Sequence, residues 1–267
     1  MEFQFFPDIS QMKTPINFRK AIPRFYKKSE VETQKDPYER FDTMVMRQTA
    51  LHLADQIWGH YPMQGILDFA KTYLPETENP AILEIGCSTG RWIASLAQSY
   101  PKASCWGLDY SYQMLKRANE HWVLGHTTYL DFSKQGHAGI LELQATPIDN
   151  LKFGLAKASE LPFADHSQDL LLHSFLLDRL DDPKKALQEM YRVLAPGAKM
   201  IFVTPLNFQK SNLWELYHPP IKIYQLLVEL GFDILEWEEE MEVLEPLDLR
   251  GNAVDWKCVG VVARKRV

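Results

Sequence analysis

Residues 82–90 read ILEIGCSTG, an apolar run that turns through two glycines into a segment with helical spacing. Glycine suits such a turn because it adopts backbone dihedral angles that other residues avoid, and because a ligand can approach it without meeting a Cβ. The next apolar run, residues 104–108, is followed by Asp109, the second acidic residue of this region after Glu84. A carboxylate there can accept both ribose hydroxyls of a nucleoside. Together the two segments predict an adenosine-containing ligand at the carboxyl ends of neighbouring strands.

The rest of the chain alternates short apolar runs with helical segments. Strands are predicted at residues 81–85, 104–108, 169–172 and 199–204, with helices at residues 90–99, 111–122 and 183–194. A helix at 221–230 and extended runs at 232–237 and 256–263 follow, and the extended runs suit a sheet edge. This alternation predicts βαβ units, and therefore an α/β, Rossmann-like fold with a mostly parallel sheet and helices on both faces.

The first 75 residues differ from the remainder. Residues 1–40 scatter aromatic side chains among charges and prolines without a period, which predicts an irregular arm. Helical spacing follows at 42–58 and 63–73. We therefore divide the chain into an arm and helical lid, 1–75, and a ligand-binding domain, 76–267.

Composition limits the classes of partner. The net charge is −6 and the charged residues are mixed along the chain, which disfavours a nucleic-acid partner. The three cysteines are scattered, so neither a disulfide framework nor a metal site is predicted. No secretory start or long apolar run is found, so we expect a cytoplasmic protein without a membrane segment.

The charge near the turn distinguishes between two kinds of nucleoside ligand. Nicotinamide dinucleotides place a pyrophosphate at a G-x-G-x-x-G turn, whereas Gly86 and Gly90 follow a G-x-x-x-G spacing with Glu84 two residues before it. A carboxylate at that position repels a pyrophosphate and favours a ligand with a positive end. S-adenosylmethionine carries an ammonium and a sulfonium and no phosphate. The electrostatics therefore favour S-adenosylmethionine.

Four motifs in order along the chain resemble the class I S-adenosylmethionine-dependent methyltransferases, in the branch called type 11. They are residues 82–90 (ILEIGCSTG), 108–111 (LDYS, with Met114, Leu115 and Ala118 after it), 158–163 (ASELPF) and 192–197 (RVLAPG). The resemblance covers roughly residues 80–206, and four ordered motifs are more specific than one glycine turn. It implies a seven-stranded sheet with an antiparallel last strand.

The resemblance also implies donor-binding roles. Glu84, Gly86 and Gly90 would hold the methionine end, with Cys87 and Ser88 in the same turn, and Asp109 would hold the ribose. The adenine would contact Tyr110, Met114, Ala158 and Ser159, while Ser174 and Phe175 would form the floor of the site. For Asp109, capping of the following helix is an alternative role, because Ser111 opens that helix. For Cys87, a small buried side chain is favoured over a reactive thiol.

Three positions depart from the family pattern. Ser88 replaces a frequent glycine, and Lys157 replaces a frequent aspartate next to the adenine. The chain between Met114 and Ala158 is longer than usual, which indicates an insertion at about 123–150, near the third strand. His121, His126 and His137 in or beside this insertion have no metal-ligand spacing, so they are interpreted as surface histidines.

The predicted function is methyl transfer by direct in-line displacement to an unidentified acceptor. A small molecule is favoured as the acceptor, with a protein as an alternative. His173 ends the predicted strand 169–172 and is a candidate general base, with simple packing as the competing role. Two other functions remain open: a non-catalytic S-adenosylmethionine-binding module, and aminopropyl transfer on the same scaffold.

Overall fold

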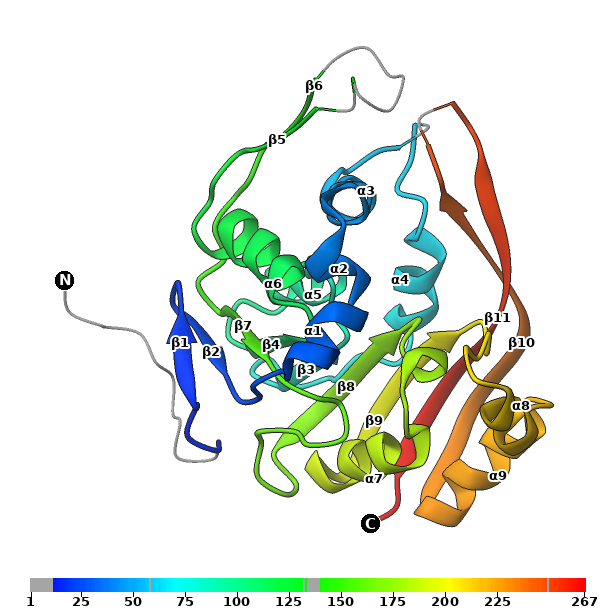
Figure 1. The fold of residues 1–267 in the computed structure, drawn as a ribbon. Coiled ribbons are helices and arrows are strands. Elements are labelled where there is room, and N and C mark those ends of the chain that lie inside the picture. The colour runs from blue at the N-terminus through cyan, green and yellow to red at the C-terminus, as the bar shows by residue number, and fades with distance from the viewer. Residues whose placement is uncertain (1–11, 58, 132, 134–139, 249) are drawn as a thin grey trace.

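A computed structural model describes residues 12–57, 59–131, 133, 140–248 and 250–267 (Figure 1). Within these residues the main sheet has the strand order β1-β2-β7-β4-β3-β8-β9-β11-β10. Its seven principal strands are β3 (Ala81–Ile85), β4 (Ser104–Asp109), β7 (Leu151–Leu155), β8 (Gln168–Ser174), β9 (Leu194–Thr204), β10 (Phe232–Pro246) and β11 (Ala253–Lys265). The strands predicted from the sequence are all present, and most are longer than predicted.

The direction of the strands confirms the expected Rossmann-like arrangement. β3 pairs in parallel with β4 and β8, and the parallel pairing continues to β7 and β9. β11, the last strand in the sequence, runs antiparallel to both β9 and β10. All parallel strands therefore end at one edge of the sheet, where such folds bind their ligands.

The sheet is buried on both faces, which is why its strands read as continuous apolar runs. Ile82 and Leu172 face one core together with α5 (Arg91–Ser99) and α6 (Tyr112–Ala118). Leu83 and Leu171 face the other core, which is covered by α7 (Pro183–Val193) and α9 (Ile221–Leu230). A short helix, α8 (Ser211–Tyr217), packs beside α9 (Figure 1).

The arm is more regular than the sequence predicts. Two short strands, β1 (Asn17–Arg19) and β2 (Ile22–Arg24), form a hairpin, and β2 joins the main sheet by pairing Arg24 with Leu155 of β7. Two short helices follow, α1 (Glu30–Lys35) and α2 (Pro37–Arg40). The expectation of an irregular arm was therefore wrong for residues 17–40, because each element here is too short to show a hydrophobic period.

Two longer helices precede the first parallel strand, α3 (Asp42–Leu53) and α4 (Gln64–Lys71). α3 ends earlier than predicted, at Leu53. α2 and α3 both contact α6, the helix that follows β4. Figure 1 shows β10 and β11 extending past the other strands of the sheet. A hydrogen bond of 3.2 Å from Gln48 to Glu245 connects α3 with β10. The helical segment therefore lies at the expected ligand edge.

The segment predicted to be an insertion lies directly before β7, the third strand of the parallel set. α6 continues as a π-helical turn (Asn119–Val123), and a separate hairpin of β5 (Thr128–Asp131) and β6 (Ile140–Leu143) follows. His137 lies outside the described residues. None of the described helices combines the length and the apolar character that a membrane span requires.

Candidate functional site

The turn between β3 and α5 has the backbone conformation that its glycines predict. Gly86 and Gly90 have φ angles of 70° and 80°, in the left-handed region. The amides of Gly86 and Cys87 both donate to the carbonyl of Leu108 at the end of β4, at 2.8 and 3.0 Å. A Cβ at Gly90 would lie 2.6 Å from the ring of Phe153. Both the dihedral angle and the packing therefore require glycine at position 90.

Ser88 also has a left-handed conformation, with a φ of 51°. This explains why glycine is frequent at the corresponding position of the family, since only glycine adopts this conformation without cost. Serine is nevertheless accommodated, because its amide donates a hydrogen bond of 2.8 Å to Asp109. The departure at position 88 leaves the shape of the turn intact.

Asp109 links the turn to the next helix. One carboxylate oxygen accepts the Ser88 amide, and the other accepts the Ser111 amide at 2.7 Å. Burial raises the pKa of Asp109 to about 6, against the opposing effect of the two amide hydrogen bonds. The alternative role of helix cap was wrong for Asp109, because the N-cap of α6 is Ser111. Ribose binding is compatible with both amide bonds, because each carboxylate oxygen has a second lone pair. The ribose role remains a prediction.

Glu84 is buried, with 3% of its surface exposed, beneath the start of α5. Its carboxylate accepts a hydrogen bond of 2.9 Å from the amide of Ile93. Burial raises the pKa of Glu84 to about 8. A positively charged group next to this carboxyl would favour its ionised form. Binding of the donor's ammonium end by Glu84 remains a prediction.

The residues predicted to contact adenine gather at the same edge. Tyr110 follows β4 directly, while Ala158 and Ser159 lie in a turn closed by a hydrogen bond from Glu160 to the carbonyl of Lys157, three residues beyond β7. Because Asp109 pairs with Leu155 of β7, the two segments are neighbours. Met114 is buried, with its sulfur 3.8 Å from the Ser88 hydroxyl. The topology therefore brings the predicted adenine residues together.

The residues that follow β8 complete this edge of the sheet. Ser174 ends the strand and is half-buried. Phe175 has a left-handed φ of 51°, and its ring packs edge-on against Trp256 of β11 at 5.9 Å.

Cys87, in the glycine turn, is buried, and burial raises the pKa of its thiol well above the usual range, so it has no nucleophilic character.

His173 does not face the site, so the expectation of a general base at this position was wrong. Its ring is fully buried and stacks on Phe202 of β9, with 4.6 Å between the ring centres and an angle of 11°. Neither ring nitrogen has a hydrogen-bond partner in the structure. Burial lowers the pKa of His173 to about 3, far below the range that suits a base near neutral pH. The competing interpretation, packing, describes this residue.

Of the two described histidines near the insertion, only His121 differs from the surface position that we expected. His126 is exposed, but His121 is buried and packs edge-on against Trp122 at 4.5 Å. In the part of the chain that the structure describes, no group of three metal-binding side chains is found.

Two residues at the glycine turn were missed by the sequence analysis. Arg91 is the first residue of α5, and its guanidinium lies over the ring of Tyr61 at 4.7 Å. One guanidinium nitrogen donates to the exposed Asp55 at 2.8 Å, while Nε is buried without a hydrogen-bond partner. The GR pair at positions 90 and 91 was the available signal, since a cation next to the turn complements a carboxylate ligand.

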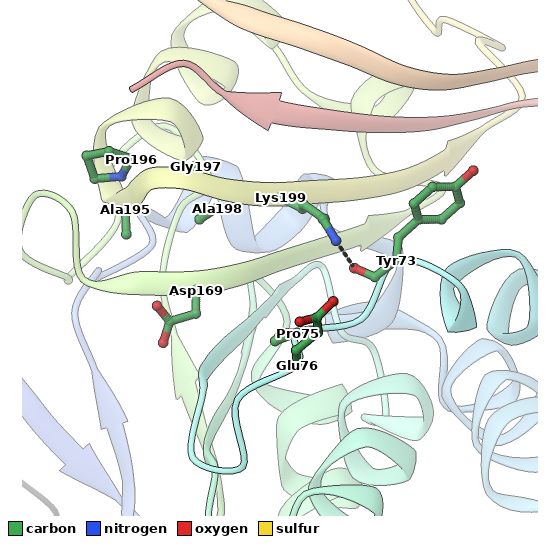
Figure 2. Close-up of a pocket in the computed structure, with 9 residues that line it drawn as sticks. All are labelled: Tyr73, Pro75, Glu76, Asp169, Ala195, Pro196, Gly197, Ala198 and Lys199. Atoms are coloured by element: carbon green, nitrogen blue, oxygen red, sulfur yellow. Dashed lines mark hydrogen bonds between the residues drawn. The ribbon is translucent and has the colours of Figure 1, made fainter.

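A hollow of about 350 Å³ opens at the opposite edge of the sheet, where β8 and β9 begin (Figure 2). Two of its polar side chains are already used within the protein. Asp169 accepts the Ala81 amide at 2.8 Å, and Lys199 donates to the carbonyl of Tyr73 at 3.1 Å. These bonds hold the starts of the strands together, so we assign the hollow no part in the site.

Comparisons with known proteins find similarity to methyltransferases over the segment that contains the glycine turn. Residues 83–202 match a family model described as a methyltransferase domain. A ubiquinone/menaquinone biosynthesis C-methyltransferase from Geotalea daltonii is 26% identical over 67% of this chain and 68% of its own length. A malonyl-[acyl-carrier protein] O-methyltransferase from Hahella chejuensis is 29% identical over 51% of this chain and 40% of its own length. Across four such relatives the match covers from 39% to 68% of their length.

A solved structure extends the similarity of fold beyond this segment. A chain from the complex of the Haloferax volcanii Trm112 methyltransferase activator with a methyltransferase aligns with a TM-score of 0.56 and 15% identity. The alignment covers 87% of this chain and 99% of that chain. At this identity the comparison shows the fold alone.

Proposed function

We propose that this chain, which belongs to the class I S-adenosylmethionine-dependent methyltransferases of the type 11 branch, transfers the donor's methyl group to a small-molecule acceptor. The observation that carries the proposal is the arrangement of charge around one glycine turn. Carboxylates of Glu84 and Asp109 flank the turn at the ends of adjacent strands, and the guanidinium of Arg91 begins the helix after it.

These residues fit the donor's chemical groups one by one. Glu84 would face the ammonium, Asp109 the ribose hydroxyls, and Tyr110 the adenine ring. Arg91, whose buried Nε has no partner, would bind the methionine carboxylate. An aminopropyl donor lacks that carboxylate, so the position of Arg91 favours methyl transfer over aminopropyl transfer.

The protein's part in the reaction is alignment and exclusion of water. S-adenosylmethionine supplies a methyl group that the positive sulfonium already activates for in-line attack. Arg91, Glu84 and Asp109 would fix the donor at both ends, which removes much of the entropic cost of reaching the reactive geometry. With His173 buried in the core, we assign the chain no general base. The acceptor atom would then attack as a lone pair that is already available.

Side chains near Phe175 support a small acceptor with an aromatic part. Trp256 packs against Phe175 and donates to Glu245 at 2.9 Å. Tyr38 is half-buried. Desolvation and the negative charges of Asp109 and Glu245 raise the pKa of its hydroxyl, and the guanidinium groups of Arg179 and Arg47 oppose this effect. Aromatic rings suit a planar molecule.

Calorimetry followed by turnover tests the proposal. We expect S-adenosylmethionine and S-adenosylhomocysteine to bind in the micromolar range, with no binding of NAD. Methyl-labelled donor would then be incubated with a panel that includes a menaquinone precursor and malonyl-[acyl-carrier protein], the compounds to which the relatives' names refer. If the well-folded protein binds neither S-adenosylmethionine nor S-adenosylhomocysteine, the proposal is overturned. Donor binding without turnover of any acceptor class would favour the non-catalytic module.

A further inference from the structure

Lys157, the residue that departs from the family pattern next to the adenine, contacts the N-terminal arm. Its ammonium lies 2.7 Å from a carboxylate oxygen of Glu32 in α1. The same ammonium lies over the ring of Tyr26, 4.0 Å from the ring centre. Both contacts join residues far apart in the sequence. Lys157 therefore contacts the arm through an ion pair and through an aromatic ring.

Glu32 is the centre of this contact. The Tyr26 hydroxyl reaches both of its carboxylate oxygens, at 2.8 and 2.7 Å. Ser29 and Glu32 form a reciprocal capping box that opens α1, with the Ser29 amide donating to Glu32 at 2.8 Å. The Lys157 ammonium, followed by these hydrogen bonds, holds the pKa of Glu32 well below its usual range. Glu32 thus stays ionised and fixes the arm to Lys157.

A second set of contacts joins the arm to the adenosine end of the site. The buried Lys28 ammonium pairs with Asp36, lies 3.6 Å from Glu39, and sits 4.0 Å from the centre of the Tyr110 ring. Glu39 accepts the amide of Tyr112, the first residue of α6, at 2.9 Å.

Tyr26 adds an aromatic contact, because its ring lies 6.0 Å from that of Tyr110 at an angle of 28°. Lys28 and Tyr26 thus both lie against Tyr110, the side chain assigned to the adenine ring. In the structure this part of the arm therefore covers part of the half-buried Tyr110 side chain.

We propose that residues 25–40 form a lid over the adenosine end of the donor site, and that Lys157 is the latch that holds the lid through Glu32. The inference rests on the proposed function, since it concerns the same donor site. Lys157 is then a positioning residue, which influences the donor through the arm. The lid opens to admit the donor and closes to slow its release.

Dissociation of S-adenosylhomocysteine, followed by stopped-flow fluorescence, tests the latch. We expect Lys157→Met and Glu32→Gln each to speed dissociation by about threefold to tenfold, the range for loss of one partly exposed ion pair with its hydrogen bonds. The double variant should dissociate no faster than the faster single variant, because both remove the same contact. Lys157→Arg keeps the positive charge, so its dissociation should stay slow.

Lys13→Met is the matched control. It removes another contact between the arm and the body, the exposed ion pair of Lys13 with Glu160 at 3.3 Å. Its dissociation rate should equal that of the unmodified protein. Equal rates for all variants, or additive effects of Lys157→Met and Glu32→Gln, would overturn the latch. Thermal denaturation of each variant shows whether the fold is retained.

Hydrogen exchange provides a second readout that does not depend on a substitution. Donor binding should slow exchange of arm amides, including those of Glu32 and Tyr38, which donate to Ser29 and Asp36. Unchanged arm exchange in a donor-bound protein overturns the lid and leaves the proposed function standing. If the unmodified protein binds no donor, the proposed function fails, and the lid fails with it.

Discussion

The carboxylate of Asp109 accepts a hydrogen bond from the backbone amide of Ser88, at 2.8 Å. This bond joins the end of β4 to the left-handed position of the turn that follows β3. The side chain assigned to the ribose therefore also holds the shape of the turn. A substitution at Asp109 affects both, and a suitable control is needed to separate them.

The first prediction concerns Asp109→Ala. Donor affinity should fall by more than about 1 kcal/mol, because a ribose contact is lost and the turn is loosened. Asp169→Ala is the matched control, since Asp169 accepts a backbone amide at 2.8 Å at the opposite edge of the sheet. Calorimetry should show weakened binding for Asp109→Ala alone, while both variants lose stability. Equal affinities would show that Asp109 only holds the turn and the residue that precedes α6.

The pH dependence of stability follows from Glu84. Burial raises its pKa from 4.5 to about 8, so the folded state binds its proton more tightly than the unfolded state does. Its stabilising contribution is complete below pH 4.5 and is lost as the pH rises toward 8. Urea unfolding at pH 5, 6, 7 and 8 should show a steeper loss of free energy in the unmodified protein than in Glu84→Gln. Parallel curves would contradict the raised pKa.

Gly90→Ala should be the more damaging of two comparable glycine substitutions. Gly90 and Gly251 both have positive φ, at 80° and 103°, so alanine is strained at either position by about 1 kcal/mol. At Gly90 the new Cβ would also lie 2.6 Å from the Phe153 ring, whereas Gly251 faces open space. Overpacking adds about 1–3 kcal/mol at Gly90 alone. Denaturant unfolding of both variants measures the difference, and equal losses would refute the packing argument.

Arg91→Met should weaken the binding of ligands that carry the methionine carboxylate and of no others. We expect S-adenosylmethionine to lose about 1.5–3 kcal/mol of binding free energy, the usual value for a hydrogen bond to a charged group. The affinity for 5′-methylthioadenosine, which lacks the carboxylate, should stay the same. Asp55→Asn is the control, because it removes the exposed partner of Arg91 and leaves the guanidinium in place. A uniform loss for both ligands would assign Arg91 to the fold of the turn.

His173→Phe should leave methyl transfer within about twofold of its original rate. The ring stacks on Phe202 and neither nitrogen has a partner, so phenylalanine keeps the packing and removes two unsatisfied polar atoms. Single-turnover rates across pH 5–9 provide the measurement, once an acceptor is known. A rate loss of more than about a hundredfold in a folded, donor-binding variant would restore the role of base to His173.

The sequence was sufficient for the parallel sheet and for the position of its ligand edge. Strands buried on both faces are continuous apolar runs, and the turn at residues 86–90 needs glycine whatever lies around it. Both signals are local, so they can be read from neighbouring residues. The antiparallel last strand followed from the family resemblance.

The arm and the charges around it were decided by tertiary contacts. β1, β2, α1 and α2 have three to six residues each, too few for a hydrophobic period to identify them. They are held in place by pairs such as Lys157 with Glu32, which are 125 residues apart. The sequence could not decide the orientation of His173 either, because a side chain at the end of a strand can face the core or the site. Only the packing of Phe202 against its ring decided that it faces the core.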